Sequence, residues 1–353
     1  MAVKMTDVAR KAKVSVATVS MILKDDQNGY KFSSDTVENV KRIADDLGYR
    51  RNKLALSLRH QKNHQVGILS GGYRMDTWGQ MLEGISSAVQ PDYALVTSVH
   101  NYNSEIEKSC LEYFLDIRVS GLIANWSGSA DTIELYKKLV YRYKIPVILI
   151  DWEIPGLNLS IFRVNDHDMS YLSTMSLIEY GHRNILGAFY GNNPQQFPVN
   201  PHISGYSDAI RSLVGVEPTY IWNENLTGPV HSSSYGIYLE RFARQITDYM
   251  LKNRQMTAIV ADDDHAAYYI MSELNKVGLR VPDDISIVGG GNKEPSKLPL
   301  INLSSTASES FAENGRKIGE IMFEMMSGKI PLCGNEYHRK LKVFLRNSVK
   351  RLH

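Results

Sequence analysis

The chain has 353 residues, of which 43% are hydrophobic and 22% charged, with a net charge of +2 and two cysteines. This length exceeds one ordinary core and predicts two or three domains of soluble, globular composition. No apolar run approaches the ~20 residues that span a bilayer, and two cysteines exclude a disulfide framework.

The charge is distributed unevenly along the chain. Residues 1–62 carry 13 Lys and Arg against 7 Asp and Glu, whereas the remaining 291 residues carry 27 against 31. A basic segment ahead of an acidic body indicates that the segment binds a polyanion, with a solvated charged surface as the alternative. The start, MAVKMTDVARKAKV, lacks the apolar stretch of a secretory signal, so we expect a cytoplasmic protein that does not contact a membrane.

Residues 1–49 predict three short helices, with Thr6, Ser15 and Ser33 as their N-caps and Gly48 as the stop of the third. Each helix has an apolar stripe that is expected to be buried. The stripes are Val8, Ala9 and Ala12; Val16, Val19, Ile22 and Leu23; and Val37, Val40, Ile43, Ala44 and Leu47. Two helices joined by a tight turn at 13–14 and followed by a third are typical of a helix-turn-helix domain.

The second helix would enter a DNA major groove with its first residues at the base edges. Hydroxyl groups on this helix can bind phosphates, and its apolar side chains favour thymine methyl groups over guanine. The candidate DNA contacts here are Thr6, Ser15, Val16, Ala17, Thr18, Ser20 and Met21. The alternative is a three-helix bundle that binds a protein partner.

Residues 50–64 predict a short basic hinge. Asn52 can cap a helix that places Ala55 and Leu58 on one face, with Lys53 among the surrounding cations. A lone helix of this length is marginal in water, so it should form only when another molecule orders it. The alternative is a flexible basic linker.

Residues 65–353 alternate apolar strands with amphipathic helices, in two successive series. The strands are expected at 66–70, 93–99, 121–125 and 147–151, then at 185–190, 219–222, 258–262 and 285–289. The helices are expected near 77–89, 105–118, 132–143, 168–180, 203–214, 234–252 and 264–277. The fold class is therefore a small all-α domain plus an α/β core of two doubly wound parallel-sheet lobes, with a ligand cleft between the lobes.

The N-terminal sequence resembles the lactose-repressor (LacI) family of bacterial transcription factors. The resemblance rests on MTDVARKAKVSVATVSMILK, FSSDTVENVKRIADDLGY and the following RRNKLALSLR. The body phrases RVSGLI (118–123), EYGHRNI (179–185), VPDDISIVG (281–289) and LRNSV (345–349) resemble the same family, so the likeness extends over essentially the whole chain. Met21, Lys24, Val37, Arg51 and a longer loop at 25–31 depart from the family pattern.

The resemblance implies a homodimeric repressor that binds a pseudo-palindromic operator in double-stranded DNA. It also implies a core with the fold of periplasmic sugar-binding proteins, in which the first lobe covers about 65–160 and 305–330, and the second about 161–304 and 331–353. The residues at the positions of Asn52, Lys53, Ala55 and Leu58 would form a hinge helix that pairs in the minor groove, where Leu58 wedges a base step.

The resemblance also places an effector site in the cleft. Trp78 matches an aromatic residue that stacks on ligand, with burial in the core as its alternative, and Asp263 matches an acid that accepts ligand hydrogen bonds. Trp222 ends a strand and can wall the cleft. His202 stands where the family usually has an Arg, and GGGNK (289–293), with Asn292, replaces a Gly-Tyr-Asp-Asp segment.

These features predict a sugar or other neutral polyol as effector, because the loss of an Arg disfavours a carboxylate or phosphate. We expect no cofactor, and no metal at 262–265, where adjacent side chains diverge. No phosphate-binding GxxxxGK[ST] or nucleophile GxSxG motif is present, which disfavours an enzyme. A solute-binding module without specific DNA recognition is the alternative to a regulator.

Overall fold

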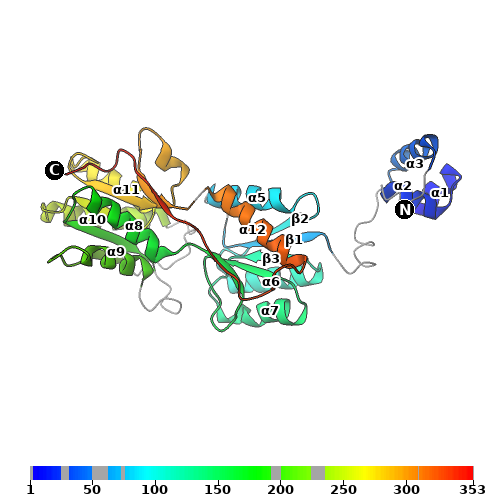
Figure 1. Cartoon of the computed structure of the whole chain (residues 1–353), viewed down its shortest axis with the longest axis horizontal. Helices are drawn as coiled ribbons and strands as arrows, with labels where there is room; N and C mark the ends of the chain where they lie inside the picture. Colours follow the sequence, from blue (N-terminus) through cyan, green and yellow to red (C-terminus); the bar gives the residue numbers. More distant parts are fainter. Residues whose placement is uncertain are drawn as a thin grey trace. The chain divides into compact units, whose positions relative to one another are not determined.

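The computed structural model of the chain describes residues 3–24, 32–49, 63–72, 76–191, 200–223, 235–308 and 310–352. The chain divides into two compact units, Met1–Asn63 and His64–His353, which we call the head and the core. Figure 1 shows the elements of both units in chain order.

The head contains three helices in its described residues: α1 (Met5–Ala12), α2 (Val16–Lys24) and α3 (Ser34–Asp46). Their apolar faces form one cluster, as expected from the sequence. Its buried members are Val8, Ala9, Ala12, Val19, Ile22, Val40, Ile43 and Ala44. Eight buried residues from three helices make a small core in which each helix depends on the other two.

Two of the three expected helix caps in the head are confirmed. Ser15 Oγ accepts from the Thr18 N–H at 3.0 Å, and Ser33 Oγ caps α3 in the same way. The expected cap at Thr6 is wrong, because α1 begins at Met5 and its N-cap is Lys4. The Lys4 N–H donates to the Asp7 carboxylate at 2.9 Å, so the acid expected in the first turn fixes the earlier start.

The core contains two six-stranded sheets. The first sheet has the order β11-β5-β4-β3-β1-β2, with every strand pair parallel. Its strands are β1 (Gln65–Ser70), β2 (Ala94–Val99), β3 (Gly121–Ala124), β4 (Val147–Ile150), β5 (Ser160–Arg163) and β11 (Glu336–His338). β3 and β4 are buried throughout, whereas β2 lies at an edge and is partly exposed.

The second sheet has the order β12-β10-β9-β8-β6-β7 and is parallel except for β12, which pairs antiparallel with β10. Its strands are β6 (Ile185–Tyr190), β7 (Thr219–Asn223), β8 (Ala258–Ala261), β9 (Ser286–Gly290), β10 (Ser304–Ala307) and β12 (Lys342–Phe344). The two sheets define the two lobes that the alternating sequence pattern predicts.

Helices cover both faces of each sheet (Figure 1). In the first lobe, α5 (Asp76–Val89) and α12 (Phe311–Met326) pack on one face, and α6 (Ser104–Asp116) with α7 (Ile133–Lys137) packs on the other. In the second lobe, α8 (Asp166–Glu179) and α9 (Pro201–Arg211) cover one face, and α10 (Tyr235–Lys252) with α11 (Asp264–Lys276) covers the other.

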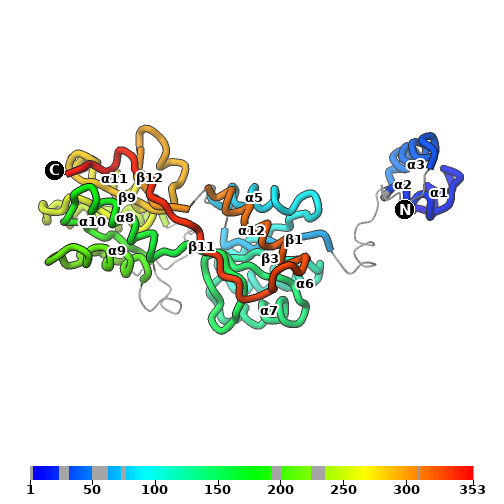
Figure 2. The backbone as a smooth tube through the Cα atoms, viewed as in Figure 1, coloured from blue at the N-terminus to red at the C-terminus, as the bar shows by residue number. Residues whose placement is uncertain are grey.

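The chain passes between the lobes three times in its described part, as the tube in Figure 2 shows. It passes from β5 to α8, from β10 to α12 and from β11 to β12. The first two passages leave the carboxyl end of a parallel strand and enter a helix N-terminus of the other lobe. The strand ends that form ligand sites in doubly wound sheets therefore face each other across the lobe boundary.

Three features of the core differ from the sequence expectation. The lobe limits expected at about 160, 305 and 331 are displaced, because β5 and β11 both pair within the first sheet and β10 pairs within the second. The helix expected at 132–143 is a 3-10 turn, the short α7 and a wider π turn. The strands β5, β10, β11 and β12 were not expected, because none of these short segments has an apolar run longer than two residues.

Candidate DNA-binding and effector sites

The turn between α1 and α2 gives the head its helix-turn-helix geometry. Lys13 adopts a left-handed backbone with φ of 56°, and the Val14 N–H donates to Ala9 O at 3.1 Å. α2 then starts at once behind its Ser15 cap. A left-handed residue between two capped helices turns the chain sharply without lengthening the loop.

The exposed start of α2 carries the residues expected to face DNA bases. Val16 is 43% exposed, and Ala17 is exposed beside it, while Val19 is fully buried. The expectation that Val16 belongs to the buried stripe of α2 is therefore wrong, and its side chain is accessible for the DNA contact that the sequence predicts. An apolar pair at a helix start can contact thymine methyl groups.

The hydroxyl residues of α2 are only partly available. Thr18 Oγ1 lies 2.8 Å from Ser15 Oγ, so the two hydroxyl groups share a hydrogen bond at the helix start. Ser20 and Met21 are half-buried, and Thr6 is exposed on α1. Thr18 must rotate or share its hydrogen bond in order to bind a phosphate.

Most of the net positive charge of residues 1–62 falls in the segment that follows the three helices in the sequence. Five of the 13 cations of residues 1–62 and none of the seven acids fall in residues 50–62. The expected hinge contacts Asn52, Lys53, Ala55 and Leu58 lie outside the described residues. The sequence thus assigns most of the non-specific attraction for DNA to this segment and not to the helices.

In the core, three consecutive acids follow β8, and each has a different environment. Asp264 is fully buried and accepts from Ser296 Oγ and Ser305 Oγ, both at 2.6 Å. Burial raises the pKa of Asp264, and the two serines act against that rise. Asp263 is the N-cap of α11, where its Oδ1 accepts from the Ala266 N–H at 2.9 Å. Asp264 therefore has a structural role, and Asp263 is tied to the helix start.

The second carboxylate oxygen of Asp263 is occupied by a lysine that the sequence analysis did not identify as a site residue. Lys293 Nζ lies 2.5 Å from Asp263 Oδ2, and the two side chains are only 11% and 19% exposed. Burial acts to raise the pKa of Asp263, but Lys293 overcomes it and the pKa falls to about 2. Asp263 is therefore an ionised group already neutralised from within the second lobe.

Asp262 and His202 form a second polar cluster at the carboxyl end of β8. Burial raises the pKa of Asp262 to about 7, and its Oδ1 is buried without a hydrogen-bond partner among the described residues. His202 Nδ1 lies 2.9 Å from Ser170 Oγ, and His202 Nε2 lies 3.8 Å from Asp166 Oδ1. Burial acts to lower the pKa of His202, but the nearby carboxylates, led by Asp262, raise it.

The two tryptophans expected at the effector site have different surroundings. Trp78 is 8% exposed and belongs to the apolar cluster beneath α5 and α12. This environment matches the alternative expectation for Trp78, burial in the core. Trp222 is 39% exposed at the end of edge strand β7, where its Nε1 donates to Gly191 O at 3.2 Å. Trp222 is thus at a strand end that faces the lobe boundary.

A pocket of about 620 Å³ opens between the lobes and contains Asn292. Its lining from the first lobe and the passage into α12 is Thr77, Gln80, Ser308, Ser310, Phe311 and Glu313. Its lining from the second lobe is His265, Gly291, Asn292, Lys293, Glu294, Pro295, Lys297, Lys342, Phe344 and Arg346. We call this the inter-lobe pocket. It contains Asn292 and the lysine partner of Asp263, but not Trp78, His202 or Trp222.

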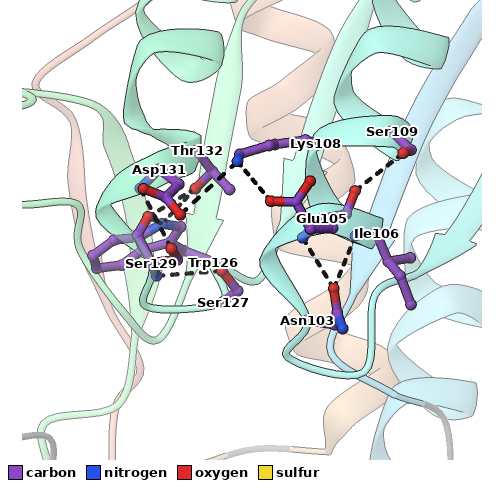
Figure 3. A network of polar contacts seen from close by, with 10 residues as sticks. All are labelled: Asn103, Glu105, Ile106, Lys108, Ser109, Trp126, Ser127, Ser129, Asp131 and Thr132. Atoms are coloured by element: carbon purple, nitrogen blue, oxygen red, sulfur yellow. Dashed lines mark hydrogen bonds and ion pairs between the residues drawn. The ribbon is translucent and has the colours of Figure 1, made fainter.

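One loop of the first lobe is fixed at the strand ends by a polar network (Figure 3). Trp126 Nε1 donates to Thr132 Oγ1 at 3.0 Å, which closes the loop after β3 on itself. Lys108 of α6 lies 2.8 Å from Glu105 and 3.9 Å from Asp131, which ties the loop to the helix. These contacts hold the loop that follows β3 against the first turns of α6.

Comparison with known sequence families divides the chain in the same way. Residues 4–52 match the family described as bacterial regulatory proteins, lacI family. Residues 174–349 match the periplasmic binding protein-like domain. No helix in the described ranges is long and apolar enough to cross a membrane.

Relatives that match nearly the whole length of this chain are transcriptional repressors. The ribose operon repressor of Haemophilus influenzae is 25% identical over 340 residues, which cover 96% of this chain and 94% of the relative. The transcriptional repressor PurR of Vibrio campbellii is 25% identical over 98% of each chain. CytR of Escherichia coli K12 is 24% identical over 93% of this chain and 91% of the relative.

Solved structures share the fold at lower identity. The lac repressor dimer bound to operator and the anti-inducer ONPF has a TM-score of 0.78 at 22% identity, over 99% of this chain and 100% of that one. The transcriptional regulator CelR in complex with cellobiose has a TM-score of 0.66 at 17% identity, over 98% and 99% of the two chains. Both likenesses extend over the helical head and the two-lobed core together.

Proposed function

Because the chain belongs to the LacI family of bacterial regulatory proteins and is a DNA-binding transcriptional regulator, we propose that it acts as a homodimer on a pseudo-palindromic operator. The affinity of the dimer for this operator is set by a small molecule bound between the lobes of the core. Its full-length relatives are repressors and not enzymes. Repression is therefore the direction of control that we assign, and the cytoplasm its place of action.

The observation that carries the DNA-binding part is the exposed start of α2. Ser15 fixes the helix N-terminus, and Val16 and Ala17 lie exposed at the first turn while Val19 and Ile22 are buried. This arrangement presents one helix per protomer to a major groove. Within the proposed domains, residues 1–49 bind the groove, 50–64 form the hinge and 65–353 hold the effector.

The effector site that we propose is the lobe boundary, at the facing strand ends. Asp263, Asn292, His202 and Trp222 all lie at carboxyl ends of second-sheet strands or at a helix start beside them. Trp78 supports this site from the core beneath it. A sugar or related metabolite with hydroxyl groups suits the acids and amide here, and ribose and cellobiose appear in the names of two similar proteins.

Binding at the boundary gives a route to regulation. A ligand that contacts both lobes favours one relative orientation of them, and the hinge segments leave the first lobe at β1. Lobe closure would bias whether the two hinges pair on DNA, which couples the sites through a two-state element. An inducer would favour release, and a corepressor would favour binding.

The DNA-binding proposal is tested by placing a negative charge at the start of α2. Ala17→Asp should weaken binding to a selected genomic fragment at least tenfold, because the added carboxylate faces the phosphates and base edges. Asn39→Asp serves as the control. It adds the same charge on α3, at a residue whose Oδ1 accepts a hydrogen bond from Arg42. Equal affinities of the two variants, measured by fluorescence anisotropy, would contradict the assignment of α2.

A further inference from the structure

The inter-lobe pocket has an excess of positive charge that the described residues do not neutralise. Four of its lining residues are lysine or arginine, namely Lys293, Lys297, Lys342 and Arg346, and two are glutamate. Lys297 forms an ion pair with Glu294, and Lys293 is held by Asp263. These two lysines are thus compensated within the second lobe.

The remaining acid of the pocket is compensated too. Glu313 lies in the first turn of α12 and pairs with Arg316 of the same helix at 2.5 Å. Neither Lys342 nor Arg346 has a carboxylate partner in the part of the chain that the structure describes. The uncompensated charge of the pocket is therefore concentrated on these two side chains.

One aromatic ring and two neutral acceptors orient this pair of cations. Lys342 Nζ lies 4.9 Å from the centre of the Phe344 ring, and the Arg346 guanidinium carbon lies 5.7 Å from it. Arg346 also donates to Leu303 O and Asn292 Oδ1, both at 2.6 Å. A guanidinium has five N–H donors, so these two bonds fix its plane and leave donors for a ligand.

Two helix starts at the same pocket add positive potential. Thr77 and Gln80 come from the first turns of α5, and Ser310 and Phe311 are the N-cap and first residue of α12. The N-terminus of a helix favours anions, because its first N–H groups have no partner within the helix. Both helices belong to the first lobe, whereas both cations lie on β12 and the strand end after it.

We propose that the inter-lobe pocket binds an anionic group of the effector, a phosphate or a carboxylate, between Lys342 and Arg346 on one side and the starts of α5 and α12 on the other. This inference rests on the proposed function, since it assigns a chemistry to the same lobe boundary. It replaces the expectation of a neutral polyol, which rested on the aromatic residues, the single acid and the absence of an Arg at position 202. An anion held in this way bridges the two lobes and draws them together.

The test uses the full chain and two anions as probes. Inorganic phosphate and citrate are titrated separately by isothermal titration calorimetry, with sodium chloride keeping the ionic strength constant. We expect saturable binding of at least one probe, one molecule per chain. Lys342→Gln should weaken it about tenfold or more, because one charge-assisted contact is lost. The Lys342 side chain is exposed and makes no hydrogen bond among the described residues, so this variant should fold.

The matched control is Lys252→Gln, which removes the same charge at the end of α10, outside the pocket. It should bind the probes like the original chain. Binding of phosphate alone points to a phosphate ester, and binding of citrate alone points to a carboxylate. No saturable binding of either probe, or equal affinity in Lys342→Gln and Lys252→Gln, would overturn the inference.

The proposed function has a separate outcome. If neutral sugars change DNA binding, and the Lys342→Gln variant responds to them fully, the anion inference fails and the regulator remains. If no metabolite changes DNA binding while phosphate still binds the pocket, the proposed regulation fails and the anion site remains.

Discussion

Lys293 Nζ lies 2.5 Å from Asp263 Oδ2, so the acid assigned to the effector already has an internal partner. Lys293 belongs to the segment that follows β9, and Asp263 to the segment that follows β8. A ligand hydroxyl at Asp263 must therefore share the carboxylate with Lys293 or bind through it. This pair links the capped start of α11 to the inter-lobe pocket.

Two substitutions at Asp263 separate its roles. Asp263→Asn and Asp263→Ala both remove the charge that faces Lys293, but only Asn can still cap α11. We expect the Ala variant to be less stable than the Asn variant by about 1 kcal/mol in denaturant unfolding. Both should bind DNA without effector and lose the effector response in an anisotropy assay. A retained response in either variant would move the effector site elsewhere.

The packing of α5 against α12 predicts opposite effects for two glycines of one helix. A Cβ atom at Gly84 would lie 1.9 Å from Ala312 O, whereas a Cβ at Gly79 meets nothing within 4 Å. Gly84→Ala should lower the unfolding free energy by at least about 1–3 kcal/mol, because α5 and α12 must move apart to make room for the methyl group. Gly79→Ala should raise stability by about 0.5–1 kcal/mol through helix propensity. Similar Tm values for the two variants would contradict this packing.

The buried carboxyl of Asp262 predicts a pH dependence of stability. Burial raises its pKa in the folded state from an ordinary value of 3.8 to about 7. The folded state then holds a proton that the unfolded state has released, so its contribution to unfolding free energy falls as pH rises from about 4 to 7. Asp262→Asn should lack this fall. The unfolding free energy of the variant minus that of the original chain should therefore be larger at pH 8 than at pH 5.

Other titratable groups face Asp262, namely His202, Asp166 and Asp263, and they remain in both proteins. Asp262→Asn also removes the carboxylate that contributes most to the raised pKa of His202, and this second effect changes stability with pH in the same direction. Asp248→Asn on the exposed side of α10 is the matched control for replacing an aspartate by asparagine. A stability difference for Asp262→Asn that does not change with pH would contradict the assignment.

The hinge prediction comes from the sequence and concerns residues outside the described ranges. Leu58→Ala should weaken binding to a specific operator much more than binding to unrelated DNA, because an apolar wedge acts only where the hinges pair in the minor groove. Competition titrations at fixed salt measure both affinities. An equal loss on the two DNAs would indicate a flexible basic linker instead.

Local chemistry made several features predictable from sequence. Ser15 and Ser33 were identified as caps because a hydroxyl ahead of an apolar stripe satisfies orphan amides, and the structure contains both hydrogen bonds. The buried strands β3 and β4 were identified because both of their faces are covered, which requires continuous apolar runs. These signals depend only on neighbours in sequence.

The remaining features depend on contacts between distant segments. β12 is a three-residue strand with an exposed lysine, so Lys342 gave no signal of its place beside Arg346. Lys293 was visible only as part of a glycine-rich segment, and its partner Asp263 lies 30 residues away. Trp78 was assigned to the ligand by resemblance, whereas packing against the first sheet buries it. Tertiary pairing decided each of these positions.

The central claim is that this chain reads a specific DNA site under the control of a metabolite. Its most direct test is a selection of bound fragments from a bacterial genomic library by the purified full-length protein, repeated over a salt series and with a panel of sugars, sugar phosphates and carboxylates. We predict one enriched pseudo-palindromic site whose recovery one compound changes. Uniform recovery of fragments at every salt concentration, with only the steep salt dependence of non-specific binding, would contradict the claim.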